Sequence, residues 1–155
     1  MTVLVTGATG FVGYNLVPAL KQQGHDVVCL IRTTSNTRLL DEIGGVRYVV
    51  GDVRDRESLE PALDGVDVVL HLAGAVKAVG RQGYFDVNTE GTRNLVEAAI
   101  EVRPDLKRFV YVSSLAAGGP SRPGAPRREQ DEDNPVTHYG RSKKAAEDII
   151  LEHRD

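Results

Sequence analysis

Three glycines spaced by three residues lie where an apolar run gives way to an amphipathic segment. They are Gly7, Gly10 and Gly13, which come after the mostly β-branched residues 2–6 and at the start of the amphipathic residues 11–23. A glycine turn between a strand and a helix lets the backbone approach a pyrophosphate closely, and the helix N-terminus directs free amides and a positive dipole at its charge. The pattern therefore predicts a strand–turn–helix unit that binds a dinucleotide.

Each glycine has its own predicted task in this turn. Gly7 allows a tight turn, Gly10 the close approach of the phosphates, and Gly13 the packing of the helix against the strand. The alternative is that the glycines only punctuate a strand–helix connection. The spacing also differs from the G-x-G-x-x-G dinucleotide fingerprint. The predicted binding residues in the turn are Gly7, Thr9, Gly10, Phe11, Val12 and Gly13.

The rest of the chain alternates short apolar runs with amphipathic segments. The predicted strands are residues 2–6, 26–31, 47–50, 66–71 and 108–113. The predicted helices are residues 11–23, 38–43, 55–63, 84–103 and 138–154, and a loop rich in glycine and proline spans residues 116–136. Apolar strands separated by helices indicate a parallel sheet with helices on both faces. We therefore predict one α/β domain of the doubly wound, Rossmann type over residues 1–155.

Composition and charge exclude several classes of function. The 155 residues are 41% hydrophobic and 26% charged, as is ordinary for a globular domain. A net charge of -3 without a basic stripe predicts no nucleic-acid partner. No apolar run approaches the roughly 20 residues of a membrane span, and no residue cluster is typical of a metal site. The single Cys29 lies in an apolar run, where we expect it to pack rather than react, and this favours a reducing cytoplasm.

Arg32 ends the second predicted strand, about twenty residues after the glycine turn. A domain that prefers NAD places an acidic residue there to hold the ribose 2′-hydroxyl. A guanidinium at that position favours a 2′-phosphate instead, with additional donors nearby. We therefore predict that NADP(H) is favoured over NAD(H), although Arg32 could also be a solvated residue at a strand end. The additional donors are Thr33, Ser35, Asn36 and Arg38.

Two further segments, residues 51–53 and 72–75, follow predicted strands at the carboxyl edge of the sheet. Ligands bind at this edge in open α/β sheets. For Asp52 the alternative is a turn or cap residue before the next helix. His71, at the end of its strand, is expected to make a satisfied hydrogen bond rather than to act as a base. The predicted cofactor residues here are Asp52, Val53, Leu72, Ala73 and Gly74.

Tyr139 and Lys143 are four residues apart in the last predicted helix and therefore share one face. A free tyrosine has a pKa of roughly 10, but a neighbouring cation favours the phenolate and suits the pair to acid–base work. Alone, such a pair can also be a core tyrosine beside a snorkelling lysine. Combined with the glycine turn and with Ser113 and Ser114 after the fifth predicted strand, it indicates a catalytic set.

The Gly-x-x-Gly-x-x-Gly turn, the upstream serine and the Tyr-x-x-x-Lys pair together resemble the extended short-chain dehydrogenase/reductase family, of the NAD-dependent epimerase/dehydratase type. The resemblance implies that Tyr139 moves a proton and that Ser114 holds the substrate oxygen. It also implies that Tyr139 and Lys143 bind the cofactor, with Lys143 at the nicotinamide ribose. Ser114 is preferred over Ser113 because it lies five residues before Gly119, as in the family.

The resemblance has further implications for the cofactor site and for partners. It places Asp52 at the adenine and the segment after the fourth strand along the cofactor. Asn88 corresponds to an asparagine that organises a proton-relay water in some members, while the alternative is a structural asparagine. Family members commonly form homodimers through the long fourth helix and the tyrosine helix. We also expect a substrate-binding region beyond residue 155.

The implied activity is oxidoreduction, or redox-coupled epimerisation or dehydration, at a carbon bearing a hydroxyl. Many family members act on nucleotide sugars, and others act on sterol-like or phenolic ketones. Two alternatives stay open at this point. The chain could be only a cofactor-binding module without a complete substrate pocket, or a nucleotide-sensing regulator that has lost the chemistry.

Overall fold

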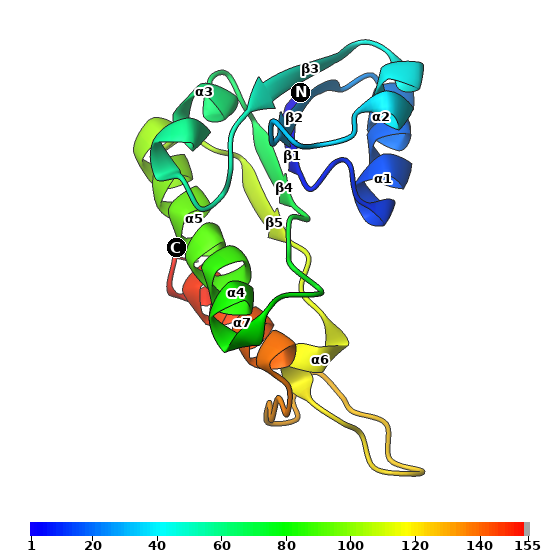
Figure 1. Ribbon diagram of the computed structural model, residues 1–155, viewed down its shortest axis with the longest axis vertical. Coiled ribbons are helices and arrows are strands. Elements are labelled where there is room, and N and C mark those ends of the chain that lie inside the picture. Colours follow the sequence, from blue (N-terminus) through cyan, green and yellow to red (C-terminus); the bar gives the residue numbers. More distant parts are fainter. Residues whose placement is uncertain (154–155) are drawn as a thin grey trace.

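Five parallel strands form one sheet in the order β3-β2-β1-β4-β5 (Figure 1). The computed structural model describes residues 1–153. The strand order reverses between β1 and β4, and open α/β sheets bind their ligands at such a switch point. The predicted α/β fold of the Rossmann type is confirmed. The strands are β1 (Thr2–Thr6), β2 (Asp26–Ile31), β3 (Val46–Val50), β4 (Val68–His71) and β5 (Arg108–Tyr111).

Two strands are shorter than predicted. The amide of Val66 bonds the Leu63 carbonyl in a turn, so pairing of β4 begins only at Val68 and not at Val66. β4 ends at His71, so β5 has paired residues only as far as Tyr111 rather than Ser113. Hydrogen-bonded pairing, rather than apolar character, sets these strand ends.

The helices differ from the predicted ones mainly in their interruptions. The predicted helix 84–103 begins earlier, at Gly80, and contains a π-helical turn. The predicted helix 55–63 is a 3₁₀ turn followed by one α-helical turn, and a short helix opens the predicted loop 116–136. The last helix ends at Glu152, and Arg154, where it was predicted to end, lies outside the described residues. The helical elements are α1 (Phe11–Gln22), α2 (Arg38–Ile43), η1 (Arg56–Leu59), α3 (Glu60–Leu63), α4 (Gly80–Phe85), η2 (Asp86–Glu90), α5 (Gly91–Val102), α6 (Leu115–Gly118) and α7 (His138–Glu152).

Alternate residues of the strands face two separate cores. Leu4 of β1 packs with Leu63 of α3 and Leu95 of α5, whereas its neighbour Val5 packs with Val17 of α1. Figure 1 accordingly shows α1 and α2 on one side of the sheet and α3 and α5 on the other. This period of two is what a sheet buried on both faces requires.

Helix α7 lies beside α4 and η2, at the carboxyl end of β5 (Figure 1). Its start is fixed by a cap, because the Thr137 hydroxyl accepts the Gly140 amide at 2.9 Å. A Cβ at Gly140 would lie 2.3 Å from the Ala116 carbonyl oxygen, so α7 and α6 approach as closely as backbones can. The tyrosine helix is thereby held against the segment that follows Ser114. Within residues 1–153, no helix has the length and apolarity needed to cross a bilayer.

Candidate functional site

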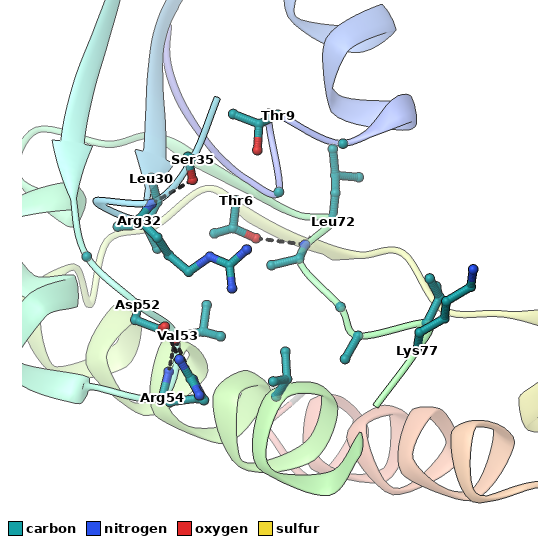
Figure 2. Close-up of a pocket in the computed structure, with 18 residues that line it drawn as sticks. Thr6, Thr9, Leu30, Arg32, Ser35, Asp52, Val53, Arg54, Leu72 and Lys77 are labelled. Carbon is teal, nitrogen blue, oxygen red and sulfur yellow. Dashed lines mark hydrogen bonds and ion pairs between the residues drawn. The ribbon is translucent and has the colours of Figure 1, made fainter. Parts of the chain in front are cut away.

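A cleft of about 450 Å³ opens at the carboxyl edge of the sheet, around the switch point between β1 and β4 (Figure 2). Its size is in the range of small-molecule sites. Most of the predicted cofactor residues from four separate segments line it together. These nine are Gly7, Thr9, Gly10, Arg32, Asp52, Val53, Leu72, Ala73 and Gly74.

Other predicted residues lie outside this lining. Phe11, Val12 and Gly13 form the first turn of α1, where the backbone amides have no acceptor within the helix. These residues can therefore bind a phosphate through their amides rather than their side chains. The Phe11 side chain is 87% exposed. Ser114, Tyr139 and Lys143 also do not line the cleft, although the Lys143 ammonium adjoins it at Gly74.

The three glycines of the turn are required to different degrees by the fold. Gly7 has a φ of 70°, and a Cβ there would lie 2.7 Å from the Ala73 amide nitrogen. At Gly13 a Cβ would lie 2.4 Å from the Gly7 carbonyl oxygen. At Gly10 the nearest atom is 3.3 Å away, and this glycine faces the cleft. The turn therefore forms a cradle that fits a pyrophosphate, and Gly10 is the glycine whose missing Cβ leaves room in it.

Arg32 extends into the cleft from the end of β2 (Figure 2). Its amide donates to the Ser35 hydroxyl at 3.0 Å, which fixes the turn that carries it. Within residues 1–153 its guanidinium makes no ion pair. Of the predicted additional donors, Ser35 lines the cleft, while Arg38 is paired with Glu42 at 3.8 Å.

Asp52 lines the cleft and also forms the turn that was the alternative for its sequence position. Its Oδ1 accepts the Arg54 amide at 3.0 Å, an Asx-type turn that precedes η1. The Arg54 side chain binds both carboxylate oxygens, with Nε 3.0 Å from Oδ1 and Nη2 2.6 Å from Oδ2 (Figure 2). This hydrogen-bonded cation holds the pKa of Asp52 below its usual range.

A directional chain of buried hydrogen bonds fixes the start of the segment after β4. Thr92 donates to the Asn88 carbonyl at 2.7 Å and therefore accepts from His71 Nε2 at 2.9 Å. Because a neutral imidazole donates from only one nitrogen, His71 Nδ1 accepts the proton of the Thr6 hydroxyl at 2.6 Å. Thr6 Oγ1 in turn accepts the Ala73 amide at 3.1 Å. Burial lowers the pKa of His71 to about 3. The expected structural role of His71 is confirmed: it is a neutral, fully bonded residue and not a base.

Asn88 occupies the π-helical turn and joins the segment after β4 to the tyrosine helix. Its side chain accepts the Ala75 amide at 2.7 Å and donates to the Ala75 carbonyl at 3.1 Å and to Ser142 Oγ at 2.9 Å. Ser142 in turn donates to the Tyr139 carbonyl at 2.7 Å. Because both amide donors and the amide oxygen are used, the structural alternative for Asn88 describes its contacts here.

Lys143 is the most buried of the predicted catalytic residues, at 3% exposure. Its Nζ donates to the Val112 carbonyl at 2.8 Å and lies 4.1 Å from the centre of the Tyr111 ring. Burial lowers the pKa of Lys143 to about 8, which still leaves it mostly charged at neutral pH. A Cβ at Gly74 would lie 3.8 Å from this Nζ, so the ammonium is next to the end of the cleft.

Tyr139 and the serines lie around the same strand end. Tyr139 is half-buried and packs edge-on against Tyr84, with ring centres 6.1 Å apart. Ser114 begins α6, and its Oγ accepts the Ala116 amide at 3.2 Å, which leaves its own proton free to donate. Ser113 Oγ is buried and has no partner among the described residues. The arrangement can orient an oxygen and move a proton beside a nucleotide cleft. No cluster suited to a metal ion occurs among residues 1–153.

Sequence reasoning missed several residues of the site. Arg54 could have been noticed, because it lies two residues after an acidic turn residue at a strand end. Gly140 could not, since its role depends on where α6 packs. The cleft residues that had not been considered are Thr6, Leu30, Arg54, Val76, Lys77 and Val87.

Known proteins are similar to this chain in sequence and in fold. The family model described as "NAD dependent epimerase/dehydratase family" matches residues 3–155. "Sterol demethylase protein B" of Methylococcus capsulatus is 41% identical over 98% of this chain and 47% of its own length. "Ceramide reductase" of Caulobacter vibrioides is 36% identical over 96% of this chain and 41% of its own length. The chain thus spans less than half the length of these relatives.

A solved structure shows the same architecture with ligands. "MoeE5 in complex with UDP-glucose and NAD" superposes with a TM-score of 0.83 and 31% identity, over 98% of this chain and 48% of that one. The resemblance predicted from the glycine turn and the Ser-Tyr-Lys residues is therefore confirmed at the level of family and fold.

Proposed function

This chain belongs to the NAD-dependent epimerase/dehydratase family, and from that premise we propose that it serves hydride exchange at a carbon bearing a hydroxyl or carbonyl. The activity is an oxidoreduction, or an epimerisation or dehydration that begins with one. The observation that carries the proposal is the junction at Gly74, where a cleft with a phosphate cradle meets the Lys143 ammonium.

The cofactor is held by the cleft residues from four strand ends. The amides at the start of α1 and the space at Gly10 suit the pyrophosphate, and Asp52 and Val53 line the adenosine end. The nicotinamide supplies a hydride acceptor or donor when it is bound. Lys143, beside Gly74, is the residue that suits the nicotinamide ribose.

The chain itself supplies the proton and orients the substrate oxygen. Tyr139 acts as general acid when a carbonyl is reduced and, as phenolate, as general base when an alcohol is oxidised. The Ser114 hydroxyl accepts a hydrogen bond from the Ala116 amide, so its own proton is available to bond the substrate oxygen.

We further propose that the chain binds NADP(H) in preference to NAD(H). Its support is Arg32, which reaches into the cleft without an ionic partner in the described part of the chain. A guanidinium can bind a 2′-phosphate with two parallel hydrogen bonds. MoeE5 is a relative seen with NAD, so the preference rests on Arg32 and not on that likeness.

Substrate class, compartment and assembly are also proposals. A nucleotide sugar is the first candidate, because the related MoeE5 binds UDP-glucose. An apolar hydroxy or keto lipid is the second, because Leu115, next to Ser114, is 95% exposed and a related protein is named for sterol demethylation.

The buried thiol of Cys29 is compatible with a reducing cytoplasm. Exposed Ile100 and Leu151 support a homodimer through α5 and α7, which a mass measurement in solution would test.

The test is turnover by the complete gene product with NADPH and a panel of ketones and nucleotide sugars. Tyr139→Phe should lower kcat by about 10²–10⁴ while cofactor affinity is kept, and Lys143→Ala should lower both. Tyr48→Phe, whose hydroxyl bonds Asp41, and Lys144→Ala, whose ammonium lies near Asp133, are matched controls. Full activity of both Tyr139 and Lys143 variants would reject the catalytic assignment. Cofactor binding without turnover by the wild type would favour a binding module or a nucleotide-sensing regulator.

A further inference from the structure

We propose that Arg54 is a cofactor-specificity residue, which acts by masking the Asp52 carboxylate from the 2′-phosphate of NADP(H). The inference rests on the proposed preference for NADP(H) and adds the residue that permits it. Arg32 supplies attraction for the phosphate. Arg54 removes the repulsion that the same part of the cleft would otherwise exert.

The masking follows from the charges at the adenosine end of the cleft. Arg32, Asp52 and Arg54 all line it. Arg32 follows β2 and Asp52 follows the adjacent strand β3, and Figure 2 shows the Arg32 side chain and the Asp52–Arg54 pair in the same part of the cleft. A 2′-phosphate has close to two negative charges at neutral pH, so an unpaired carboxylate facing it would oppose binding. With Arg54 present the three side chains have a net positive charge, and without it they have none.

The pair is built so that Arg54 can neutralise Asp52 and still face the ligand. Its Nε and Nη2 occupy both carboxylate oxygens. A guanidinium has five N–H donors, so Nη1 and one Nη2 proton remain for a second anion. The side chains are 55% exposed at Arg54 and 24% exposed at Asp52, so the open side of the pair is the arginine.

The backbone fixes the pair before any ligand binds. The Arg54 amide donates to Asp52 Oδ1, and the Asp55 amide closes the turn by donating to the Asp52 carbonyl at 2.8 Å. The Asp52 amide donates to Ser58 Oγ at 3.0 Å. Exposed ion pairs add little to folding stability. Loss of Arg54 should therefore appear in ligand preference rather than in the fold.

The experiment compares the dissociation constants of NADP⁺ and NAD⁺ for the complete gene product and its variants. Arg54→Ala should weaken NADP⁺ binding by about tenfold or more and NAD⁺ binding by less than about threefold. Adding Asp52→Asn to Arg54→Ala should restore most of the NADP⁺ affinity, because asparagine keeps the Oδ1 acceptor of the turn without the charge. Arg103→Ala is the matched control, since Arg103 binds Asp105 two residues away with the same two nitrogens, outside this cleft.

The outcomes separate this inference from the proposed function. A wild type without preference for NADP⁺ refutes the proposed cofactor. A wild-type preference that survives Arg54→Ala refutes the role of Arg54 alone. Failure of Asp52→Asn to restore binding overturns the masking, because Arg54 would then act only by direct contact. Unchanged thermal unfolding of Arg54→Ala ensures that the loss is not one of folding.

Discussion

Replacement of Gly10 by alanine separates the cofactor role of the glycine turn from its structural role. Gly10 has extended backbone, with a φ of -85° and a ψ of 172°, which any residue can adopt. An added Cβ would meet only the Gly7 carbonyl oxygen, at 3.3 Å. The close contact and the poorer helix cap destabilise the variant slightly, whereas the lower entropy of its unfolded chain stabilises it. We therefore expect the free energy of unfolding to change by no more than about 1 kcal/mol.

The same methyl group lies in the cradle where the pyrophosphate must approach. If it displaces hydrogen bonds to a charged phosphate, each worth roughly 1.5–3 kcal/mol, cofactor affinity falls by about 100-fold. Gly13→Ala should behave in the opposite way. Its Cβ would lie 2.5 Å from the Ala8 Cα, a rigid neighbour, so we expect about 3 kcal/mol of destabilisation.

The assay is cofactor titration by calorimetry together with urea unfolding of each variant. Gly24→Ala is the control: Gly24 has a φ of 77° and open space around it, so alanine there should cost about 1 kcal/mol of stability and leave binding unchanged. Wild-type cofactor affinity in a folded Gly10→Ala protein would show that the cradle is not the phosphate site.

Three further predictions concern buried or unpaired charge. The pKa of Lys143 is lowered from 10.5 to about 8, so the folded state disfavours its ammonium and stability from this group rises as pH rises from about 8 to 10.5. Lys143→Met should therefore raise the unfolding free energy at pH 7 by about 2 kcal/mol, with a smaller gain at pH 10, and a loss at pH 7 in urea unfolding would contradict this. His71→Leu should cost about 2–3 kcal/mol at pH 7, because Thr6 loses the acceptor of its proton and Thr92 loses a donor. The pKa of His71 is about 3 in the folded protein and 6.5 in the unfolded chain, so the wild type loses stability as pH falls below 6.5. The difference in unfolding free energy between the wild type and His71→Leu should therefore become smaller below pH 6.5. A difference that does not change with pH would contradict this. Arg32→Ala should weaken NADP⁺ by about tenfold more than NAD⁺ in a titration, and equal losses would count against the 2′-phosphate contact.

Much of this fold was predictable because its signals are local. The apolar strands and the glycine turn each lie in a few consecutive residues, and they locate β1, β2 and the cleft. The carboxyl edge of the sheet then brings Arg32, Asp52 and Leu72 together, because parallel strands end on one side.

What could not be predicted depends on packing between distant segments. The π-helical turn at Asp86–Glu90 places Asn88 against Ala75 and Ser142, and nothing in its residues alone indicates that insertion. The close approach of Gly140 to Ala116 requires the position of α6.

A crystal structure of the protein with NADP⁺ would test the proposed site most directly. The pyrophosphate should lie over Gly10 at the start of α1, the 2′-phosphate on Arg32, and the nicotinamide ribose beside Lys143 with Tyr139 facing the ring. A dinucleotide bound in another place, or one whose nicotinamide lies far from Tyr139 and Lys143, would contradict this placement.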